Sequence, residues 1–215
     1  MSDKFRQGEF EALSFDKLEI FQASHHLYQP LVHLSHGAGQ ESLVKVVPTH
    51  LNEGEKRFVD DLEAFCKAEA KGLLVDVELY LLRNHNSDKA ISFFAESGFR
   101  PDFILWLLQE DRQTIAFLDP KGLRNFTDNF NNPKVQLGRR IKNLEKNLKR
   151  NEIRLESYLI AGTYRNLLRW PSPGNGAQQA TAADFREHHI LCAKDEPDTY
   201  VRDLITELQS RAGVA

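Results

Sequence analysis

The sequence predicts an α/β fold in which helices flank a mixed central sheet and a β-rich segment precedes the sheet. Apolar residues recur at helical spacing in two segments, residues 55–70 and 133–150. Short β-prone runs lie between and after these segments, so the order along the chain is helix, three strands, helix, strand. This order is typical of a layered α/β domain.

Length and composition fit one globular domain with appendages. The chain has 215 residues, of which 41% are hydrophobic and 27% charged. No segment reaches the roughly 20 apolar residues that span a bilayer, and residues 1–16 lack the basic and apolar regions of a secretion signal. We therefore expect a cytoplasmic protein with no membrane association. The net charge of −3 does not indicate nucleic-acid binding, but a whole-chain average conceals local patches.

The chain divides into a β-rich extension, residues 1–50, and a domain, residues 51–215. In the extension, the β-prone runs 25–35 and 42–52 flank the turn-forming cluster HGAGQE and predict a hairpin. An amphipathic helix over residues 55–70 opens the domain. Its inward stripe consists of Phe58, Val59, Leu62, Phe65 and Cys66.

The remaining elements follow from local patterns. Strands are predicted over residues 73–84, 153–164 and 188–193, with a hairpin over residues 99–122. Residues 84–98 form an irregular link, and the Asn- and Asp-rich residues 124–132 a loop. The second helix begins with Pro133 in its first turn, where proline is tolerated. A flexible stretch is expected over residues 170–183, and a closing helix over residues 198–210.

The hairpin, FRPDFILWLLQEDRQTIAFLDPKG, carries an aspartate at each open end. A turn at Glu110 and Asp111 aligns residues in antiparallel register: Leu108 with Gln113, Trp106 with Ile115, and Ile104 with Phe117. The same register sets Asp102 opposite Asp119, with Cβ atoms about 4.5–5.5 Å apart. Lys121 returns to the side of Asp119 because side chains alternate, while Pro120 ends the ladder and leaves its carbonyl free.

Both faces of this hairpin are apolar, which predicts strands inside a sheet that is covered on both sides. One face carries Phe103, Leu105 and Leu107, and the other Ile104, Trp106 and Phe117. Two carboxylates opposite each other at a buried edge repel, so we expect a cation there. Carboxylates with a spare carbonyl suit Mg²⁺, and a lysine beside it could polarise the attacking water or steady charge on a phosphate. A simpler interpretation remains open, in which Asp102 caps a loop and residues 119–122 form a turn.

The same residues resemble the signature of the PD-(D/E)xK nuclease superfamily. The segments LNEGEKRFVDDL, LYLLRN, SFFAESGFRPDFILWLL and IAFLDPKGLRN resemble the C-terminal endonuclease domain of type III restriction (Res) subunits and related DEAD/DEAH helicase-nucleases. The resemblance runs from about Tyr28 to Leu208 and is strongest over residues 51–125. The chain departs from the pattern at Arg100, where the family often has an aromatic residue, and this affects local packing.

This resemblance implies a restriction-endonuclease-like αβββαβ core and Mg²⁺-dependent cleavage of DNA phosphodiesters, with Mn²⁺ as a substitute. Asp102 and Asp119 become metal ligands, the Pro120 carbonyl a further ligand, and Lys121 the catalytic lysine. A glutamate on the first helix usually completes such sites; Glu55 is favoured and Glu63 is the alternative. Implied partners are DNA, a helicase or translocase portion and a methyltransferase subunit. The competing hypothesis is a nuclease-like fold that binds DNA or docks without catalysis.

The second helix carries a local positive surface. Its cations, opposed by Glu145 alone, are Lys134, Arg139, Arg140, Lys142, Lys146, Lys149 and Arg150. A buried stripe of Val135, Ile141, Leu144 and Leu148 would turn these cations outward, towards DNA phosphates. The alternative is a merely solvated face. Lys134 and Gln136 resemble the Lys or Gln that many of these nucleases bring from this helix.

Other residue types predict no second centre. Cys66 and Cys192 are too few and too far apart for a Cys-based zinc site, and we expect two buried thiols. His25, His26, His33 and His36 lack a cysteine or carboxylate at metal spacing, so we expect no zinc there. No phosphate-binding loop or helicase motif occurs, so any ATP-driven translocation must come from elsewhere.

Overall fold

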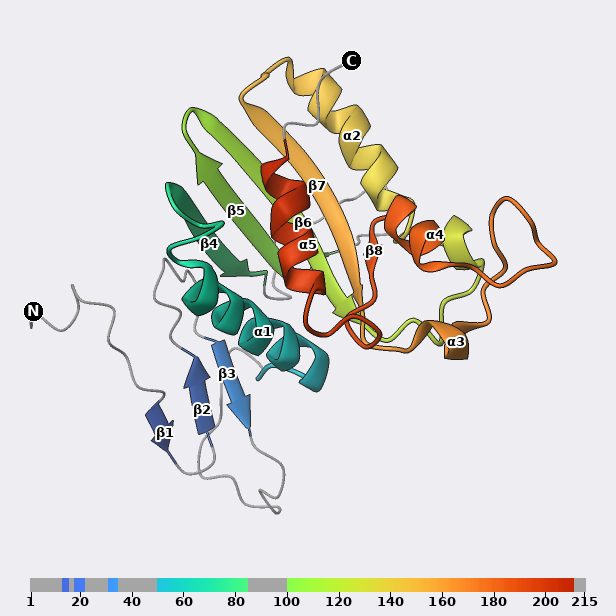
Figure 1. Ribbon diagram of the computed structural model, residues 1–215, viewed down its shortest axis with the longest axis horizontal. Coiled ribbons are helices and arrows are strands. Elements are labelled where there is room, and N and C mark those ends of the chain that lie inside the picture. Colours follow the sequence, from blue (N-terminus) through green and yellow to red (C-terminus); the bar gives the residue numbers. More distant parts are fainter. Residues whose placement is uncertain (1–12, 16–17, 22–30, 35–49, 85–99, 211–215) are drawn as a thin grey trace, which may run out of the picture.

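A computed structural model describes residues 13–15, 18–21, 31–34, 50–84 and 100–210 (Figure 1). Near the N-terminus, β1 (Leu13–Phe15), β2 (Leu18–Phe21) and β3 (Leu31–Leu34) form an antiparallel sheet. Of the two runs expected to form a hairpin, the first contains β3, and the second lies largely outside the described residues, as do His25, His26, His36 and most of the link over 84–98. The boundary at residue 50 therefore stays a prediction.

The five-stranded sheet is mixed, which confirms the predicted α/β class. Its spatial order is β4 (Val77–Arg83), β5 (Phe103–Gln109), β6 (Arg112–Lys121), β7 (Ile153–Ala161) and β8 (Ile190–Leu191). Strands β4 to β6 pair antiparallel, whereas β6 to β8 pair parallel. The helices are α1 (Glu53–Glu69), α2 (Leu137–Leu148), α3 (Arg165–Leu168), α4 (Ala182–Glu187) and α5 (Tyr200–Gln209). A 3₁₀ helix spans Asn129–Asn131.

The β5–β6 hairpin has the predicted register, but the prediction that Pro120 ends the ladder is wrong, because β6 continues to Lys121 in parallel pairing with β7. The pairs of the hairpin include Leu108 with Gln113, Trp106 with Ile115, and Ile104 with Phe117. Glu110, in the turn, has a φ of 53°, a left-handed conformation that the tight connection requires. The open end of the hairpin, where Asp102 and Asp119 lie, is therefore set by the turn chemistry at its other end.

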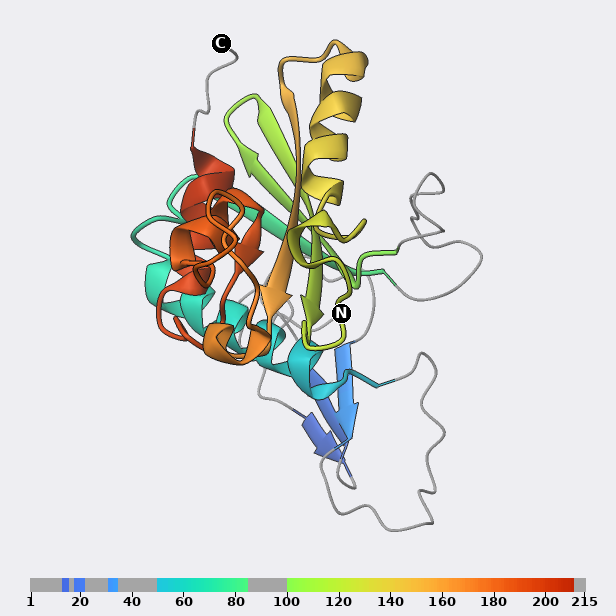
Figure 2. The same ribbon diagram turned by 90° about the vertical axis from the view of Figure 1, so that its right-hand side faces the viewer.

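The sheet is covered on both faces, as the apolar hairpin predicted. Figure 2 shows α1 and α5 on one side of the sheet and α2 on the other. Phe103 and Leu105 belong to the core that includes Phe58 of α1. Ile104 packs with Ile141 of α2 in a separate core. Because alternate residues of β5 enter different cores, a slip of one residue would turn each to the wrong side.

Helix α1 begins where its sequence places a capping box. The Asn52 side chain accepts hydrogen bonds from the backbone N–H groups of Gly54 and Glu55, and the Glu55 side chain accepts one from the Asn52 N–H. The helix then buries Phe58 and Leu62 against the sheet. This cap fixes the first turn of α1, and with it the direction of the Glu55 side chain.

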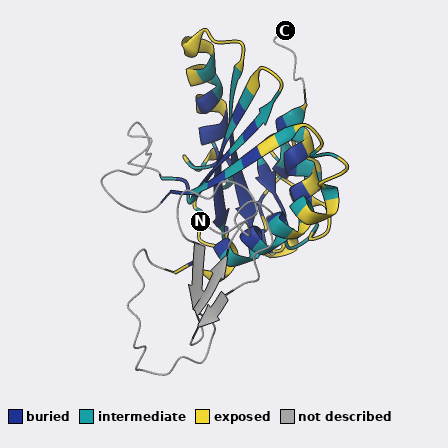
Figure 3. Cartoon of the chain, turned by 90° about the vertical axis from the view of Figure 1, so that its left-hand side faces the viewer, coloured by how far each residue is buried: buried dark blue, intermediate teal, exposed yellow. Residues whose placement is uncertain are grey.

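Helix α2 differs from its prediction at both ends. It begins at Leu137 rather than Pro133, because residues 133–136 form turns. Leu144 and Leu148, expected to be buried, are 47% and 45% exposed. The buried residues of α2, which include Ile141, all lie in its first half, and its last turns are largely exposed, as the burial colours in Figure 3 show.

The segment expected to be flexible, residues 170–183, has defined packing. Trp170 is 3% exposed and stacks on Phe185 of α4, and Phe130 meets its edge. Thr181 and Asp184 form a capping box that starts α4. Backbone hydrogen bonds hold the largely exposed residues between Trp170 and Ala180: the Ala180 N–H donates to the Trp170 carbonyl and the Ser172 N–H to the Gln178 carbonyl, each at 2.8 Å.

Two further expectations concern cysteines and membranes. Cys192 is buried as expected, while Cys66 is only partly buried, and both thiols are free. Within the described part of the chain, no helix is long and apolar enough to cross a membrane.

Candidate active site

The candidate site lies at the open end of the β5–β6 hairpin, where Asp102 and Asp119 meet as predicted. Asp119 is 2% exposed near the end of β6. Asp102 directly precedes β5, and its carbonyl accepts a 2.8 Å hydrogen bond from the backbone N–H of Asn84. The two carboxyl groups lie within hydrogen-bonding reach of each other. Two acidic groups are thus held together at one buried edge of the sheet.

This arrangement changes the acidity of Asp102. Burial raises the pKa of its carboxyl to about 8, and the hydrogen bond and charge of Asp119 and the charge of Glu55 act in the same direction. Asp102 therefore keeps its proton at neutral pH unless a cation replaces that proton. Apart from the Asp102 carboxyl, no hydrogen-bond donor among the described residues reaches Oδ1 of Asp119, although this oxygen is buried. An orphaned carboxylate oxygen of this kind suits a cation.

Two lysines lie on the other oxygen of Asp119. Lys121 Nζ is 3.4 Å and Lys134 Nζ 3.7 Å from Oδ2. Burial opposes protonation of Lys121, but the charges of Asp119 and Asp102 outweigh it and raise its pKa. The pKa of Lys134 is instead lowered, by burial and then by the neighbouring Lys121. Lys121 therefore holds its charge more firmly than Lys134 does.

The structure brings Glu55, not Glu63, to this site. Glu55 is buried in the first turn of α1, close enough for its charge to act on Asp102. Its Oε2 lies 3.0 Å from Nη2 of Arg83, on β4. Glu63 lies two turns further along α1 and pairs with Lys67. Glu55 is thus next to the paired aspartates, but an arginine and the helix cap occupy the same carboxylate oxygen.

The oxygen donors at the site limit which metal ion it could hold. Among the described residues, no group of three or more His, Cys, Asp or Glu side chains is arranged to hold a metal ion. The site offers two carboxyl groups, and the carbonyl oxygen of Pro120 faces the start of α1, 3.8 Å from where a Cβ on Gly54 would lie. Mg²⁺ commonly uses one or two carboxylates and completes its shell with water and substrate phosphate. The residues therefore fit Mg²⁺ better than a metal that needs a full protein cage.

A cavity of about 600 Å³ adjoins the paired aspartates. Asp102, Pro120 and Lys121 line it on the side of the site, and Arg57 and Lys194 line it further away. Its volume falls within the range of about 300–1,000 Å³ that is usual for ligand sites. A substrate could thus approach Asp102 and Lys121 from this side.

The predicted DNA-binding residues lie in different surroundings. Lys134 lies at the site itself. Arg139 and Arg140 are exposed on α2, as predicted. The Gln136 amide donates a 2.6 Å hydrogen bond to the Phe130 carbonyl, so it holds the loop before α2. The prediction that Lys142 projects outward is wrong, because its ammonium contacts the buried carboxylate of Glu156.

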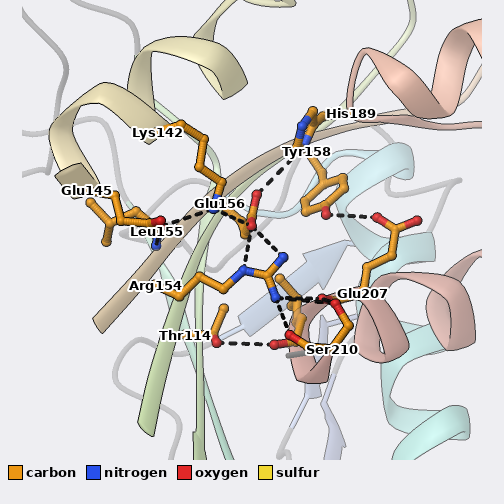
Figure 4. Close-up of polar contacts among 11 residues, drawn as sticks. Thr114, Lys142, Glu145, Arg154, Leu155, Glu156, Tyr158, His189, Glu207 and Ser210 are labelled. Carbon is orange, nitrogen blue, oxygen red and sulfur yellow. Dashed lines mark hydrogen bonds and ion pairs between the residues drawn. The ribbon is translucent and has the colours of Figure 1, made fainter. Parts of the chain in front are cut away.

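Glu156, on β7, is the centre of a second buried polar cluster that the sequence did not reveal (Figure 4). It is 1% exposed, and Lys142 of α2 and Arg154 of β7 each lie 2.6 Å from its Oε1. Arg154 also donates hydrogen bonds to the carbonyls of Glu207 and Ser210 at the end of α5. The cluster ties helices on opposite faces to one strand, which is a structural role.

Sequence reasoning also missed Arg83 and Asn84, which support the site from β4. Arg83 pairs with Glu55, and the Asn84 side chain donates a 2.9 Å hydrogen bond to the Pro101 carbonyl. A signal for both existed, because two polar residues end the apolar run LYLL. Nothing in the sequence marked Arg57 or Lys194, which reach the cavity from α1 and from the segment after β8.

Comparisons with protein-family models, with curated proteins and with solved structures gave no match to this chain.

Proposed function

We propose that this chain is a Mg²⁺-dependent DNA endonuclease domain of the PD-(D/E)xK type, the cleavage module of a type III-like restriction or helicase-nuclease system. One observation carries the proposal: Asp102 and Asp119 meet at the open end of the hairpin, with Lys121 on the same carboxylate. The order α1, β4, β5, β6, α2, β7 supports it, because this is the order expected of a restriction-endonuclease-like core. A helicase or translocase portion would move the module along DNA, and a methyltransferase subunit would recognise the sequence.

Each residue has a defined part in this proposal. The carboxylates of Asp102 and Asp119 and the carbonyl of Pro120 would hold Mg²⁺, or Mn²⁺ in its place. The ion would act as a Lewis acid that lowers the pKa of a bound water and polarises the phosphate. The ammonium group of Lys121 lies beside this pair and stabilises the negative charge that develops on the phosphate. Lys134, whose ammonium also lies near Asp119, would orient the DNA strand and add a second positive charge.

The first test is cleavage of plasmid DNA by Asp119→Asn, which keeps the shape of the side chain and removes its charge. The parent protein is expected to cut with Mg²⁺ or Mn²⁺ and to be inactive in EDTA. The variant should cut about 100-fold or more slowly than the parent, because the ion loses the carboxylate of Asp119 as a ligand. Asp111→Asn, an exposed change at the turn of the same hairpin, is the matched control. Equal cleavage by the parent and Asp119→Asn in every metal would refute the proposal.

The second test is the pH dependence of Mn²⁺ binding. Because the pKa of Asp102 is about 8, binding must displace its proton at lower pH. Mn²⁺ affinity should therefore rise by about tenfold per pH unit between pH 6 and 8 and then level off. Calorimetry in two buffers of different ionisation enthalpy counts the proton released. An affinity that does not change with pH, or that survives Asp102→Asn, would contradict the assignment of Asp102.

A second candidate function, a nuclease-like fold that binds DNA or docks without catalysis, is favoured by one observation. Oε2 of Glu55 accepts hydrogen bonds from Arg83 and from the Asn52 N–H. The carboxyl groups of Asp102 and Asp119 are then the two that remain for the ion. This candidate predicts salt-sensitive DNA binding without metal-stimulated cuts. The absence of any Mn²⁺ binding in the parent protein would select it.

A further inference from the structure

The cavity beside the paired aspartates is lined by residues from the start of α1, from the ends of β6 and β7 and from the segment after β8. Figures 1 and 2 show the first turn of α1 beside the ends of β6 and β7. The cavity lies on the α1 side of Asp102 and Lys121, whereas Lys134 approaches Asp119 from the segment that precedes α2. A DNA strand that crosses the site would therefore meet Lys134 on one side and the cavity on the other.

Three cationic side chains line the cavity, of which Arg57 lies 3.7 Å from Asp61 and Lys121 lies 3.4 Å from Asp119. Arg57, Lys121 and Lys194 line it, against the two carboxyl groups of Glu53 and Asp102. The carboxyl group of Asp102 belongs to the proposed metal site, where the ion would neutralise it. Arg57 and Lys194 are both half-buried and come from segments far apart in the chain. Cations brought together in this way favour an anionic ligand.

Among the described residues, the rest of the wall offers no aromatic face for a base. It includes small residues: Gly54, Gly122, Gly162 and Ala193. The aromatic residues of the lining, Phe58 and Tyr200, are 1% and 0% exposed and offer no ring face for stacking. Stacking on aromatic rings is the usual way in which proteins hold unpaired bases. A lining of small residues and cationic side chains instead suits a sugar–phosphate unit.

We propose that this cavity binds a backbone phosphate of the nucleic-acid strand next to the one that is cleaved, with Arg57 and Lys194 as its cationic contacts. The inference rests on the proposed function and adds the path of the strand, which runs from Lys134 across the aspartates into the cavity. It also implies that this contact is independent of base sequence. The bound group is either an internal phosphodiester or the phosphate at a strand end, which share the same chemistry.

The test measures DNA binding in EDTA, so that it does not depend on cleavage. Fluorescence anisotropy with a short oligonucleotide is compared for the parent, Lys194→Ala, Arg57→Ala and the control Arg112→Ala, an exposed cation at the far end of β6. Both cavity variants should bind several-fold more weakly, and the slope of log K against log salt should become shallower by about one. The control should bind like the parent.

A steric variant separates the cavity from general charge. Among the described residues, a Cβ at Gly162 would meet only the backbone carbonyl of Lys121, at 3.7 Å from its oxygen and 4.0 Å from its carbon. Because Gly162 lines the cavity, Gly162→Leu is expected to fill part of it with every charge retained. It should weaken DNA binding as much as Lys194→Ala does. If it lowers the melting temperature, the Arg57→Ala, Lys194→Ala double variant decides instead. Binding by these cavity variants that equals that of Arg112→Ala would overturn the inference.

Two further arms identify the phosphate. A larger loss for a 5′-phosphorylated oligonucleotide than for its 5′-hydroxyl counterpart assigns the cavity to a strand end, whereas equal losses assign it to an internal phosphodiester; both outcomes support the inference. Absence of cleavage by the parent protein would count against the proposed nuclease but not against this binding site. In a cleaving protein, the cavity variants should raise KM and leave kcat nearly unchanged.

Discussion

Replacement of Lys121 by alanine is expected to reduce cleavage by about 100-fold or more, with DNA affinity and Mn²⁺ binding nearly intact. The ammonium of Lys121 lies 3.4 Å from Asp119 Oδ2 and keeps its charge, since the neighbouring carboxyl groups raise its pKa. Such a group acts on charge that develops in the transition state, so its loss affects kcat more than binding. Lys134 remains beside Asp119 in the variant and helps to preserve the carboxylate pair.

A variant of α2 provides the opposite pattern. Arg139→Ala combined with Arg140→Ala removes two exposed cations that are separate from the aspartates. This double variant should weaken DNA binding and flatten its salt dependence, while single-turnover cleavage at saturating enzyme stays close to that of the parent. Normal cleavage by Lys121→Ala, or a loss of binding as large as in the α2 variant, would show that the open end of the hairpin has been misinterpreted.

Substitution of Glu156 by alanine is expected to lower the free energy of unfolding by about 3 kcal/mol, the lower end of the range for a broken buried ion pair. Its carboxylate is 1% exposed and receives Lys142 and Arg154 at 2.6 Å each. Without it, Arg154 loses its charged partner and, among the described residues, keeps only uncharged acceptors, while Lys142 keeps only Glu145, at 3.0 Å. The loss stays at the lower end because the side chains of Lys142 and Arg154, 32% and 23% exposed, can turn partly towards water.

Urea unfolding followed by circular dichroism measures this loss. Glu152→Ala is the matched control, since Glu152 precedes the same strand and pairs with Arg150 at the surface; this change should have little effect. The variant Lys142→Met tests the cluster from the side of α2 and should also destabilise the fold. If Glu156→Ala unfolds at the same urea concentration as the control, the cluster does not hold α2 and α5 to β7.

The hairpin and the two aspartates at its open end were predictable from local sequence. A two-residue turn and strict alternation set the pairing of Ile104 with Phe117, and hence the meeting of Asp102 with Asp119. Both pairs lie within one hairpin, where backbone geometry leaves few alternatives. The first turn of α1 was predictable for the same reason, because a capping box is a local signal.

Tertiary structure alone decided which charged residues face the site and which are structural. Lys142 and Arg139 read alike in the sequence, yet one meets buried Glu156 and the other is exposed. Helical spacing also could not show that Leu144, in the second half of α2, is exposed. Helical spacing could not predict the cavity either, because its lining combines Arg57 with Lys194, which are far apart in the sequence. The physical reason is that a local pattern specifies the direction of a side chain relative to its own helix or strand, whereas its partner depends on how distant segments pack.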